Sequence, residues 1–361
     1  MKVVIDNIAF SIQQIGGISV VWYEIIKRML KDERFDVEFL EFSDAGNNYY
    51  RKLLEIPQDR VKVEGNRVVM KWRRYCNPKL GTRDPFIFHS SYYRTSIDKN
   101  ALNFTTVHDF NYELYGAKNL ATIIHKWQQK NAVMKSDVVV CVSENTKKDL
   151  LSIYHGVDES KVHVVYNGVS DDYKVMETLN EKRLPFKKTT YCLFVGGRPA
   201  YKNFNLAVDS IAATNYNLVI VGPPLSDEET LSLNEKLGGN RYVCLSKVPN
   251  NVLNEIYNGA FCLLYPSSCE GFGIPCIEAQ KAGCPVIAYN GSSIPEVVAD
   301  KYALIKDFKI ESVVEKIKRY ENEELRKGAI EAGLLFTQKF SWDNTYNQLA
   351  DLYLSKEEEK I

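Results

Sequence analysis

The sequence predicts an α/β fold with two doubly wound, Rossmann-like domains. The chain has 361 residues, and a single hydrophobic core stops growing at ~250–300 residues, so two domains are expected. Short apolar runs alternate with amphipathic segments from end to end, which is typical of parallel sheets covered by helices on both faces. The apolar (45%) and charged (25%) fractions are those of a globular protein.

The strands are expected at the short apolar runs. Those of the first half are Val3–Ile5, Val37–Phe42, Phe86–His89, Phe104–Val107, Val138–Val142 and Val162–Val165. Those of the second half are Cys192–Val195, Leu218–Val221, Val243–Leu245, Cys262–Tyr265 and Val286–Ala288. The first helix should bury one face, formed by Ile18, Val21, Trp22, Ile25, Ile26 and Met29. Helices are also expected at Asn205–Ala213 and Val252–Tyr257.

A polar segment, Ser170–Lys188, separates the two halves and is expected to be a linker. We therefore assign residues 1–172 to an N-terminal domain, 173–188 to the linker and 189–340 to a C-terminal domain. Doubly wound sheets bind ligands at the carboxyl ends of their strands, so two of them would face each other across a cleft. A last helix is expected within 341–361, because apolar side chains recur there at helical spacing, at Trp342, Tyr346, Leu349 and Tyr353.

Charge and cysteine content narrow the classes of function. Acidic and basic residues are equal in number, 46 each, so no overall field favours a nucleic acid. No apolar run approaches the ~20 residues that a membrane span needs, and Met1–Asp6 reaches an acid too soon for a signal peptide. The eight cysteines form no C-x-x-C pair or zinc-site spacing. We expect a cytoplasmic protein with reduced cysteines.

The stretch from Tyr265 to Glu278 is the most informative part of the chain. Glu270 should lie on the loop that leaves a strand, and Glu278 in the first turns of a helix begun by Pro275. The backbone N–H groups of 271–273 can face a ligand at that helix start. Carboxylates accept hydrogen bonds from hydroxyls and amides donate them, which suits a polyhydroxylated ligand. An ordinary turn followed by a glutamate that complements the helix dipole is the alternative.

Two basic residues follow the first strand of the second half. Arg198 and Lys202 come after Cys192–Val195 through Gly196 and Gly197. Fixed cations at this place would stabilise a leaving diphosphate more in the transition state than in the ground state. A solvated surface pair is the alternative. The chain contains no Asp-x-Asp motif, so we expect no metal requirement and no other cofactor.

These segments resemble a known family. Glu270 to Glu278 is similar to the E-x7-E signature of the retaining glycosyltransferases of family 4, which have the GT-B fold. The likeness continues through Gly283–Ala288 and Ser293–Val297, and Phe194–Asn203 resembles the family's diphosphate-binding segment. It covers nearly the whole chain. It implies that the last helix crosses back onto the first domain.

The resemblance implies roles for the residues of the second half. Glu278 would take the two ribose hydroxyls of the donor, and Arg198 and Lys202 would bind its diphosphate. Glu270 would face the transferred sugar, assisted by the backbone of Gly271, Phe272 and Gly273. The family mechanism is a front-face reaction, in which the leaving phosphate oxygen takes the acceptor proton and the anomeric configuration is retained.

The resemblance also implies donor contacts from the first half. Gly16 and Gly17 precede the first helix, where the family has a glycine loop that approaches a phosphate. Thr106–Asp109 resembles the family's T-x-H-D, in which the histidine contacts the donor sugar. We therefore favour His108 over His89, which also ends a strand.

The acceptor side is less defined. Residues 68–75 mix basic and aromatic side chains and could dock on the anionic inner membrane, although a helix or strand with a solvated basic face explains them as well. Tyrosines of the first half could stack on acceptor sugars or simply fill half-buried surface: Tyr49, Tyr50, Tyr92, Tyr93, Tyr112 and Tyr115.

The function that the sequence predicts is hexosyl transfer from a nucleotide sugar to a saccharide or lipid-linked acceptor. The local sequences Tyr201–Asn203 and Ser292–Glu296 resemble those of bacterial mannosyltransferases of surface polysaccharide synthesis, which use GDP-mannose as the donor. A UDP-hexose is the alternative donor. A related epimerase or phosphorylase, and a catalytically silent sugar-nucleotide-binding subunit, are the alternatives. A dehydrogenase is disfavoured because no G-x-G-x-x-G follows a strand.

Overall fold

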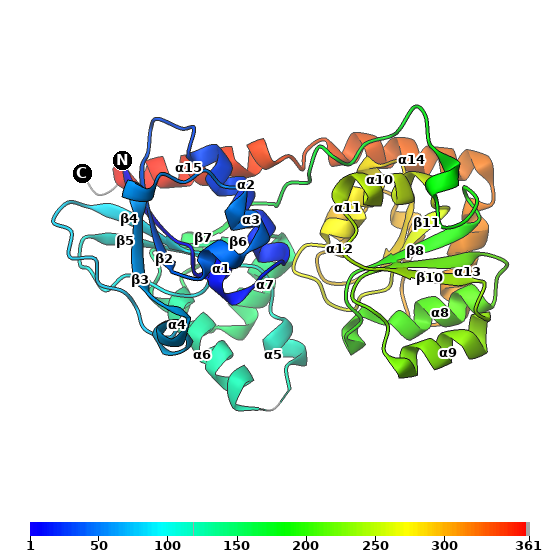
Figure 1. Cartoon of the computed structure of the whole chain (residues 1–361), viewed down its shortest axis with the longest axis horizontal. Coiled ribbons are helices and arrows are strands. Elements are labelled where there is room, and N and C mark those ends of the chain that lie inside the picture. The colour runs from blue at the N-terminus through cyan, green and yellow to red at the C-terminus, as the bar shows by residue number, and fades with distance from the viewer. Residues whose placement is uncertain (118, 359–361) are drawn as a thin grey trace. The chain divides into compact units, whose positions relative to one another are not determined.

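The chain folds into two compact units (Figure 1). The structure is a computed structural model and describes residues 1–117 and 119–358. The first unit comprises Met1–Gly168 and the residues from Trp342 onward, and the second comprises Val169–Ser341. Each unit is built around one parallel sheet, so the predicted α/β fold is confirmed.

The sheet of the first unit has the strand order β3-β2-β1-β4-β5-β6-β7. Its strands are β1 (Lys2–Asp6), β2 (Asp36–Phe42), β3 (Val61–Gly65), β4 (Phe86–Ser90), β5 (Ala101–Val107), β6 (Val138–Cys141) and β7 (Val162–Val164). Every strand expected in this half is present. The sequence misses β3 because it is an edge strand with exposed side chains at Lys62 and Val63, and so has no apolar run.

Helices cover the sheet of the first unit on both faces. They are α1 (Ile8–Ile12), α2 (Gly17–Met29), α3 (Tyr49–Lys52), α4 (Arg67–Arg73), α5 (Asn111–Tyr115), α6 (Leu120–Lys135), α7 (Glu144–Ile153) and α15 (Trp342–Glu358). The predicted face of α2 is buried in the main core, apart from the half-buried Ile18. Among the described residues, none of the helices is both long and apolar enough to span a bilayer.

The last helix packs in the core of the first unit, as the resemblance implied. Trp342 and Tyr346 join the cluster formed by α2 and the sheet. The hydroxyl of Tyr353 lies 2.6 Å from Nδ1 of His89, whose Nε2 lies 2.9 Å from Oγ1 of Thr106. Burial lowers the pKa of His89 to about 3. His89 is therefore a neutral core residue that fastens α15 to β4.

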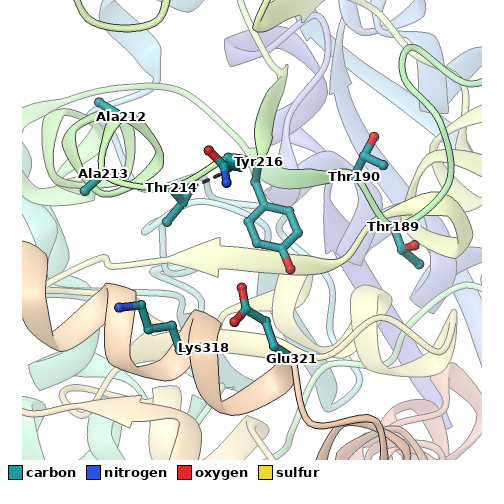
Figure 2. Close-up of a pocket in the computed structure, with 9 residues that line it drawn as sticks. Thr189, Thr190, Ala212, Ala213, Thr214, Tyr216, Lys318 and Glu321 are labelled. Atoms are coloured by element: carbon teal, nitrogen blue, oxygen red, sulfur yellow. Dashed lines mark hydrogen bonds between the residues drawn. The ribbon is translucent and has the colours of Figure 1, made fainter.

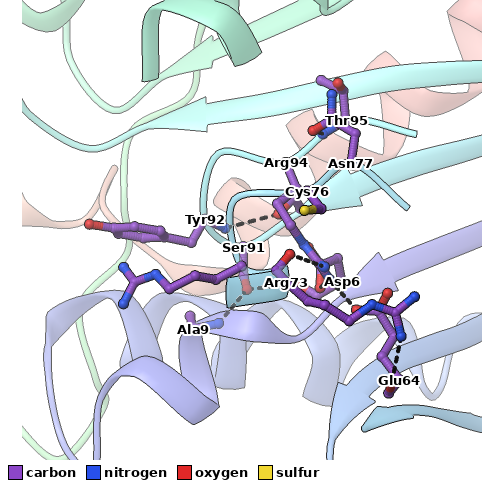
Figure 3. A network of polar contacts seen from close by, with 12 residues as sticks. Asp6, Ala9, Glu64, Arg73, Cys76, Asn77, Ser91, Tyr92, Arg94 and Thr95 are labelled. Carbon is purple, nitrogen blue, oxygen red and sulfur yellow. Dashed lines mark hydrogen bonds and ion pairs between the residues drawn. The ribbon is translucent and has the colours of Figure 1, made fainter. Parts of the chain in front are cut away.

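A buried ion-pair network joins the carboxyl ends of β1, β3 and β4 (Figure 3). The guanidinium of Arg94 lies 2.6 Å from Oδ1 of Asp6 and 2.6 Å from Oε2 of Glu64. Ser90 donates to Oδ2 of Asp6, 2.7 Å away. Only 1% of the Arg94 side chain is exposed. The network fixes the segment that follows β4 against the sheet.

The sheet of the second unit has the order β10-β9-β8-β11-β12-β13. Its strands are β8 (Tyr191–Val195), β9 (Asn217–Val221), β10 (Tyr242–Leu245), β11 (Cys262–Tyr265), β12 (Val286–Tyr289) and β13 (Leu304–Ile305). Its helices are α8 (Phe204–Ala212), α9 (Asp227–Leu237), α10 (Asn250–Gly259), α11 (Ile274–Lys281), α12 (Ile294–Val297), α13 (Ile310–Tyr320) and α14 (Glu323–Thr337). All strands predicted here are present, and β13 is too short for its apolar pattern to be recognised.

Residues 173–188, predicted to be a linker, belong to the second unit. Tyr173 is buried against Tyr257 of α10. The amide oxygen of Asn254 accepts from the backbone N–H of Lys174, 3.0 Å away, and α10 binds Met176 in the same way. The segment packs on α10 through its backbone and through Tyr173, and its polar composition does not reveal this.

Candidate active site

The candidate site lies at the carboxyl ends of β8 and β11. These strands are neighbours although they are not consecutive, so the strand order reverses between them. In open parallel sheets, ligands bind outside the carboxyl ends of the strands at this reversal. The loop after β8 carries Lys202 and the loop after β11 carries Glu270. The topology therefore brings the two predicted segments to one place.

Lys202 and Glu270 form an ion pair. Lys202 ends the short 3₁₀ helix Ala200–Lys202, and its ammonium donates to the carboxylate of Glu270 and to the hydroxyl of Tyr265, 3.0 Å away. The side chains of Lys202 and Glu270 are only 13% and 12% exposed. Because little water screens them, each charge acts strongly on the other and on a substrate charge placed beside them.

Two serines hold the backbone of Glu270. The N–H of Glu270 donates to Oγ of Ser292 at 2.9 Å, and Oγ of Ser293 donates to the carbonyl oxygen of Glu270 at 2.9 Å. The N–H of Ser268 donates to the carbonyl oxygen of Tyr201, 2.8 Å away, which ties the two loops together. The carboxylate is thus held by a supported backbone, as preorganised electrostatic catalysis requires.

Gly273 is needed for the turn between Glu270 and α11. Its φ is +95°, a conformation that side-chain-bearing residues rarely adopt. A Cβ atom there would lie 2.9 Å from Cδ1 of Ile294 and 3.3 Å from Cγ2 of Val297. The helix then begins at Ile274 with Pro275 in its first turn, as the sequence predicted.

Glu278 lies on α11 with two tyrosine partners. The hydroxyl of Tyr257 donates to Oε2 of Glu278 at 3.1 Å, and Tyr173 also hydrogen-bonds to the carboxylate. Burial raises the pKa of Glu278 to about 7, against the lowering effect of these two hydrogen bonds. The carboxylate therefore gains or loses its charge near neutral pH.

Arg198 is placed differently from Lys202. Its guanidinium lies against Glu229 of α9, with Nε 2.6 Å from Oε1 and Nη2 3.0 Å from Oε2. The remaining contacts are to the carbonyl oxygens of Pro223 and Pro224. The side chain is 6% exposed. The structure thus places Lys202 beside Glu270, whereas Arg198 is bound to Glu229 of α9 and to the loop after β9.

The residues predicted in the first unit lie at the carboxyl edge of its sheet. Gly16 caps the start of α2 and Gly17 is its first residue. His108 follows β5, and its Nε2 is buried without a partner among the described residues. Burial lowers the pKa of His108 to about 4, so the imidazole is neutral at neutral pH.

Sequence reasoning missed Tyr265, Tyr257 and Glu229. Tyr265 is the last residue of β11, so its place beside the Glu270 loop could have been inferred from the strand end. Tyr257 and Glu229 lie on the separate helices α10 and α9, and no spacing connects them to their partners.

A cavity of 550 Å³ lies elsewhere in the second unit (Figure 2). It is lined by Thr190 and Tyr216, which precede β8 and β9, and by Lys318 and Glu321 at the end of α13. It therefore lies at the amino edge of the sheet and is separate from the candidate site. Among the described residues, no cluster of three or more histidine, cysteine or acidic side chains could hold a metal ion.

The two parallel-sheet, Rossmann-like units match solved structures of GT-B glycosyltransferases. One of these is HepE from Anabaena in complex with UDP and glucose, with a TM-score of 0.71 and 16% identity over 98% of this chain and all of that one (100%). At a sequence identity this low, the structural match establishes the fold alone. It confirms the predicted GT-B fold.

Residues 15–173 match the family described as Glycosyltransferase Family 4, and residues 175–336 match the one described as Glycosyl transferases group 1. The chain belongs to glycosyltransferase family 4. It is 26% identical to an uncharacterized glycosyltransferase of Methanocaldococcus jannaschii over 97% of this chain and 99% of that protein. It is 29% identical to the O-antigen chain mannosyltransferase RfbU of Salmonella typhimurium over 54% of each chain.

Proposed function

We propose that this glycosyltransferase moves a hexose from a nucleotide sugar to a saccharide or lipid-linked acceptor in polysaccharide or glycolipid biosynthesis. The transfer retains the anomeric configuration and needs no metal ion. One observation carries the proposal: Lys202 and Glu270 form an ion pair, largely shielded from water, beyond the carboxyl ends of neighbouring strands. A shielded cation beside a carboxylate suits a substrate that combines a leaving diphosphate with sugar hydroxyls.

The residue roles are those that the family resemblance implies, and the Lys202–Glu270 contact supports them. The ammonium of Lys202 stabilises the negative charge that grows on the diphosphate, and Glu270, released from it, accepts hydrogen bonds from the sugar hydroxyls. Glu278 accepts the ribose hydroxyls, and the neutral His108 contacts the sugar. A leaving phosphate oxygen takes the proton of the acceptor hydroxyl. For Arg198 to bind the diphosphate, phosphate oxygens must replace the carboxylate of Glu229.

GDP-mannose is the donor that we favour. RfbU, a relative over half of the chain, is named as a mannosyltransferase. UDP-glucose is the second candidate, since HepE, which shares the fold, was solved with UDP and glucose.

Two helices of the first unit support a peripheral contact with the cytoplasmic face of the membrane. Neither α4 nor α6 contains an acidic residue, and both contain lysine. Their large exposed side chains include Val68, Trp72, Leu120, Ile123 and Trp127. Basic residues mixed with exposed tryptophans fit an anionic lipid surface. Co-sedimentation with anionic but not zwitterionic vesicles, reduced in Trp72→Gln, is expected. Equal sedimentation with both would refute this contact.

Calorimetry in the presence of EDTA tests the donor site. GDP, UDP, GDP-mannose and UDP-glucose are titrated into the wild type, Lys202→Gln and the control Lys236→Gln, which removes a surface lysine of α9 paired with Asp209. We expect one nucleotide class to bind, about 10- to 100-fold more weakly in Lys202→Gln only, as for the loss of a charge-assisted hydrogen bond. Binding that needs a divalent ion, or that is unchanged in Lys202→Gln, would refute the site. The anomeric configuration of the product, read by NMR, tests retention.

A further inference from the structure

A second group of side chains gathers at the carboxyl edge of the first sheet. Arg74 and Tyr75 follow α4, Tyr92 follows β4, Tyr112 lies on α5 and His125 on α6. The segments that hold Arg74, Tyr92 and Tyr112 leave β3, β4 and β5 at their carboxyl ends, where parallel sheets bind ligands. None of these residues has a part in the donor chemistry described above.

Arg74 has no acidic partner among the described residues. Its guanidinium lies 5.1 Å from the centre of the Tyr75 ring and 5.8 Å from that of Tyr92. Its Nε is buried and makes no hydrogen bond in the described part of the chain. Arg94, by contrast, is paired with Asp6. A half-buried guanidinium supported by rings alone keeps the fork formed by its two terminal nitrogens available for an anion.

The neighbouring rings offer a surface for a sugar. Tyr112 stacks on His125 with the ring centres 3.9 Å apart, and 45% of Tyr112 is exposed, so the outer face of its ring is open. The Tyr92 hydroxyl lies 3.2 Å from Nε2 of His125. Burial and the charges of Arg74 and Lys126 lower the pKa of His125 to about 4, so the imidazole is neutral at neutral pH. Aromatic faces with polar edges bind the apolar face and the hydroxyls of a pyranose.

The group is held by rigid elements. The side-chain amide of Gln128 on α6 donates to the carbonyl oxygen of Arg74 at 2.7 Å. The backbone N–H of Tyr92 donates to Oγ of Ser90, 3.2 Å away, which in turn donates to Asp6 in the network of Figure 3. A site positioned in this way loses little entropy when it binds.

We propose that Arg74, Tyr92, Tyr112 and His125 bind the acceptor, and that the acceptor carries an anionic group, a phosphate or a carboxylate, next to its sugar ring. The inference rests on the proposed transferase function and names the acceptor class. Arg74 binds the anion through its planar fork, and the open face of Tyr112 takes the sugar ring.

The test uses the full chain with a saturating nucleoside diphosphate, which blocks the diphosphate-binding part of the donor site, so that the anionic probes cannot bind there. Mannose 1-phosphate, glucuronic acid and neutral methyl mannoside are titrated by ligand-observed NMR. The variants are Arg74→Gln, Arg74→Lys, Tyr112→Ala and the control Arg73→Gln, whose guanidinium bonds to the Glu64 carbonyl oxygen. We expect an anionic probe to bind at least tenfold more tightly than methyl mannoside, and Arg74→Gln to abolish that preference.

The outcomes separate the possibilities. Arg74→Lys keeps the charge but loses the planar fork and should keep only part of the preference. Arg73→Gln should keep all of it, and Tyr112→Ala should weaken both probe types several-fold. Preference for the phosphate or for the uronic acid identifies which anion the acceptor carries. An anionic preference that persists in Arg74→Gln, or none in the wild type, overturns the inference. Failure of the nucleotide itself to bind would instead contradict the proposed transferase function.

Discussion

Replacing Glu278 with glutamine should change how the stability of the second unit depends on pH. The pKa of Glu278 is raised from 4.5 to about 7, so the folded state holds this proton more tightly than the unfolded chain does. The stabilisation is therefore complete below pH 4.5 and is lost as the pH rises through 7. At about 1.4 kcal/mol per pKa unit, the free energy of unfolding falls by about 3 kcal/mol.

The assay is urea unfolding of the full chain from pH 4.5 to 8.5. Unfolding of the second unit is monitored by hydrogen exchange in peptides from α11. The difference between wild type and Glu278→Gln should decrease by about 3 kcal/mol over this range, because all other titrating groups cancel. Glu315→Gln, which removes an exposed glutamate of α13, should run parallel to the wild type. A constant difference between the wild type and Glu278→Gln would refute the raised pKa.

Protonation of Glu278 should also affect the affinity for the nucleotide donor. If ribose hydroxyls bind the ionised carboxylate, nucleotide affinity falls up to tenfold per pH unit below pH 7 in the wild type. Glu278→Gln should show weaker binding that does not vary in this window. Calorimetry at pH 5.5, 6.5 and 7.5 measures both.

Three further substitutions test the framework of the two units. Ser292→Ala removes the acceptor of the Glu270 N–H and should lower turnover about tenfold with little change in nucleotide affinity; a larger loss of affinity than of turnover would contradict this. Gly273→Ala forces a side chain into a left-handed turn that has no room for it, and should destabilise by about 1–3 kcal/mol in thermal unfolding. Gly197→Ala, whose nearest contact would be an ordinary 3.7 Å, is the matched control and should be milder. Asp6→Asn removes one of the two negative charges that neutralise the buried Arg94 and should cost about 3–5 kcal/mol in chemical denaturation, whereas a cost below 1 kcal/mol would show that the network is not essential.

The sequence predicts most of the sheet framework, because buried parallel strands are apolar throughout. It fails where burial is partial, as in the edge strand β3, or where an element is very short, as in β13. The proximity of Lys202 and Glu270 is predictable in outline, since both follow strands that a doubly wound sheet places near its reversal.

The partners of the site residues are not predictable in the same way. Arg198 meets Glu229 because α9 begins with a capping box that places this glutamate near the end of β9. The raised pKa of Glu278 depends on its burial beside tyrosines from α10 and from residues 173–188. Such contacts arise from loop packing, which leaves no periodic trace in the sequence.

The position of α15 has a consequence for synthesis of the chain. The first unit is discontinuous, and its core lacks the side chains of Trp342, Tyr346, Leu349 and Tyr353 until that segment leaves the ribosome. Every residue of the second unit emerges earlier. The second unit can therefore complete its folding first, although it is synthesised after most of the first unit. Until the segment from Trp342 onward emerges, the incomplete core of the first unit exposes hydrophobic side chains. A chain that terminates before Trp342 and is released from the ribosome should resist protease in residues 169–341 and be cleaved in residues 1–168.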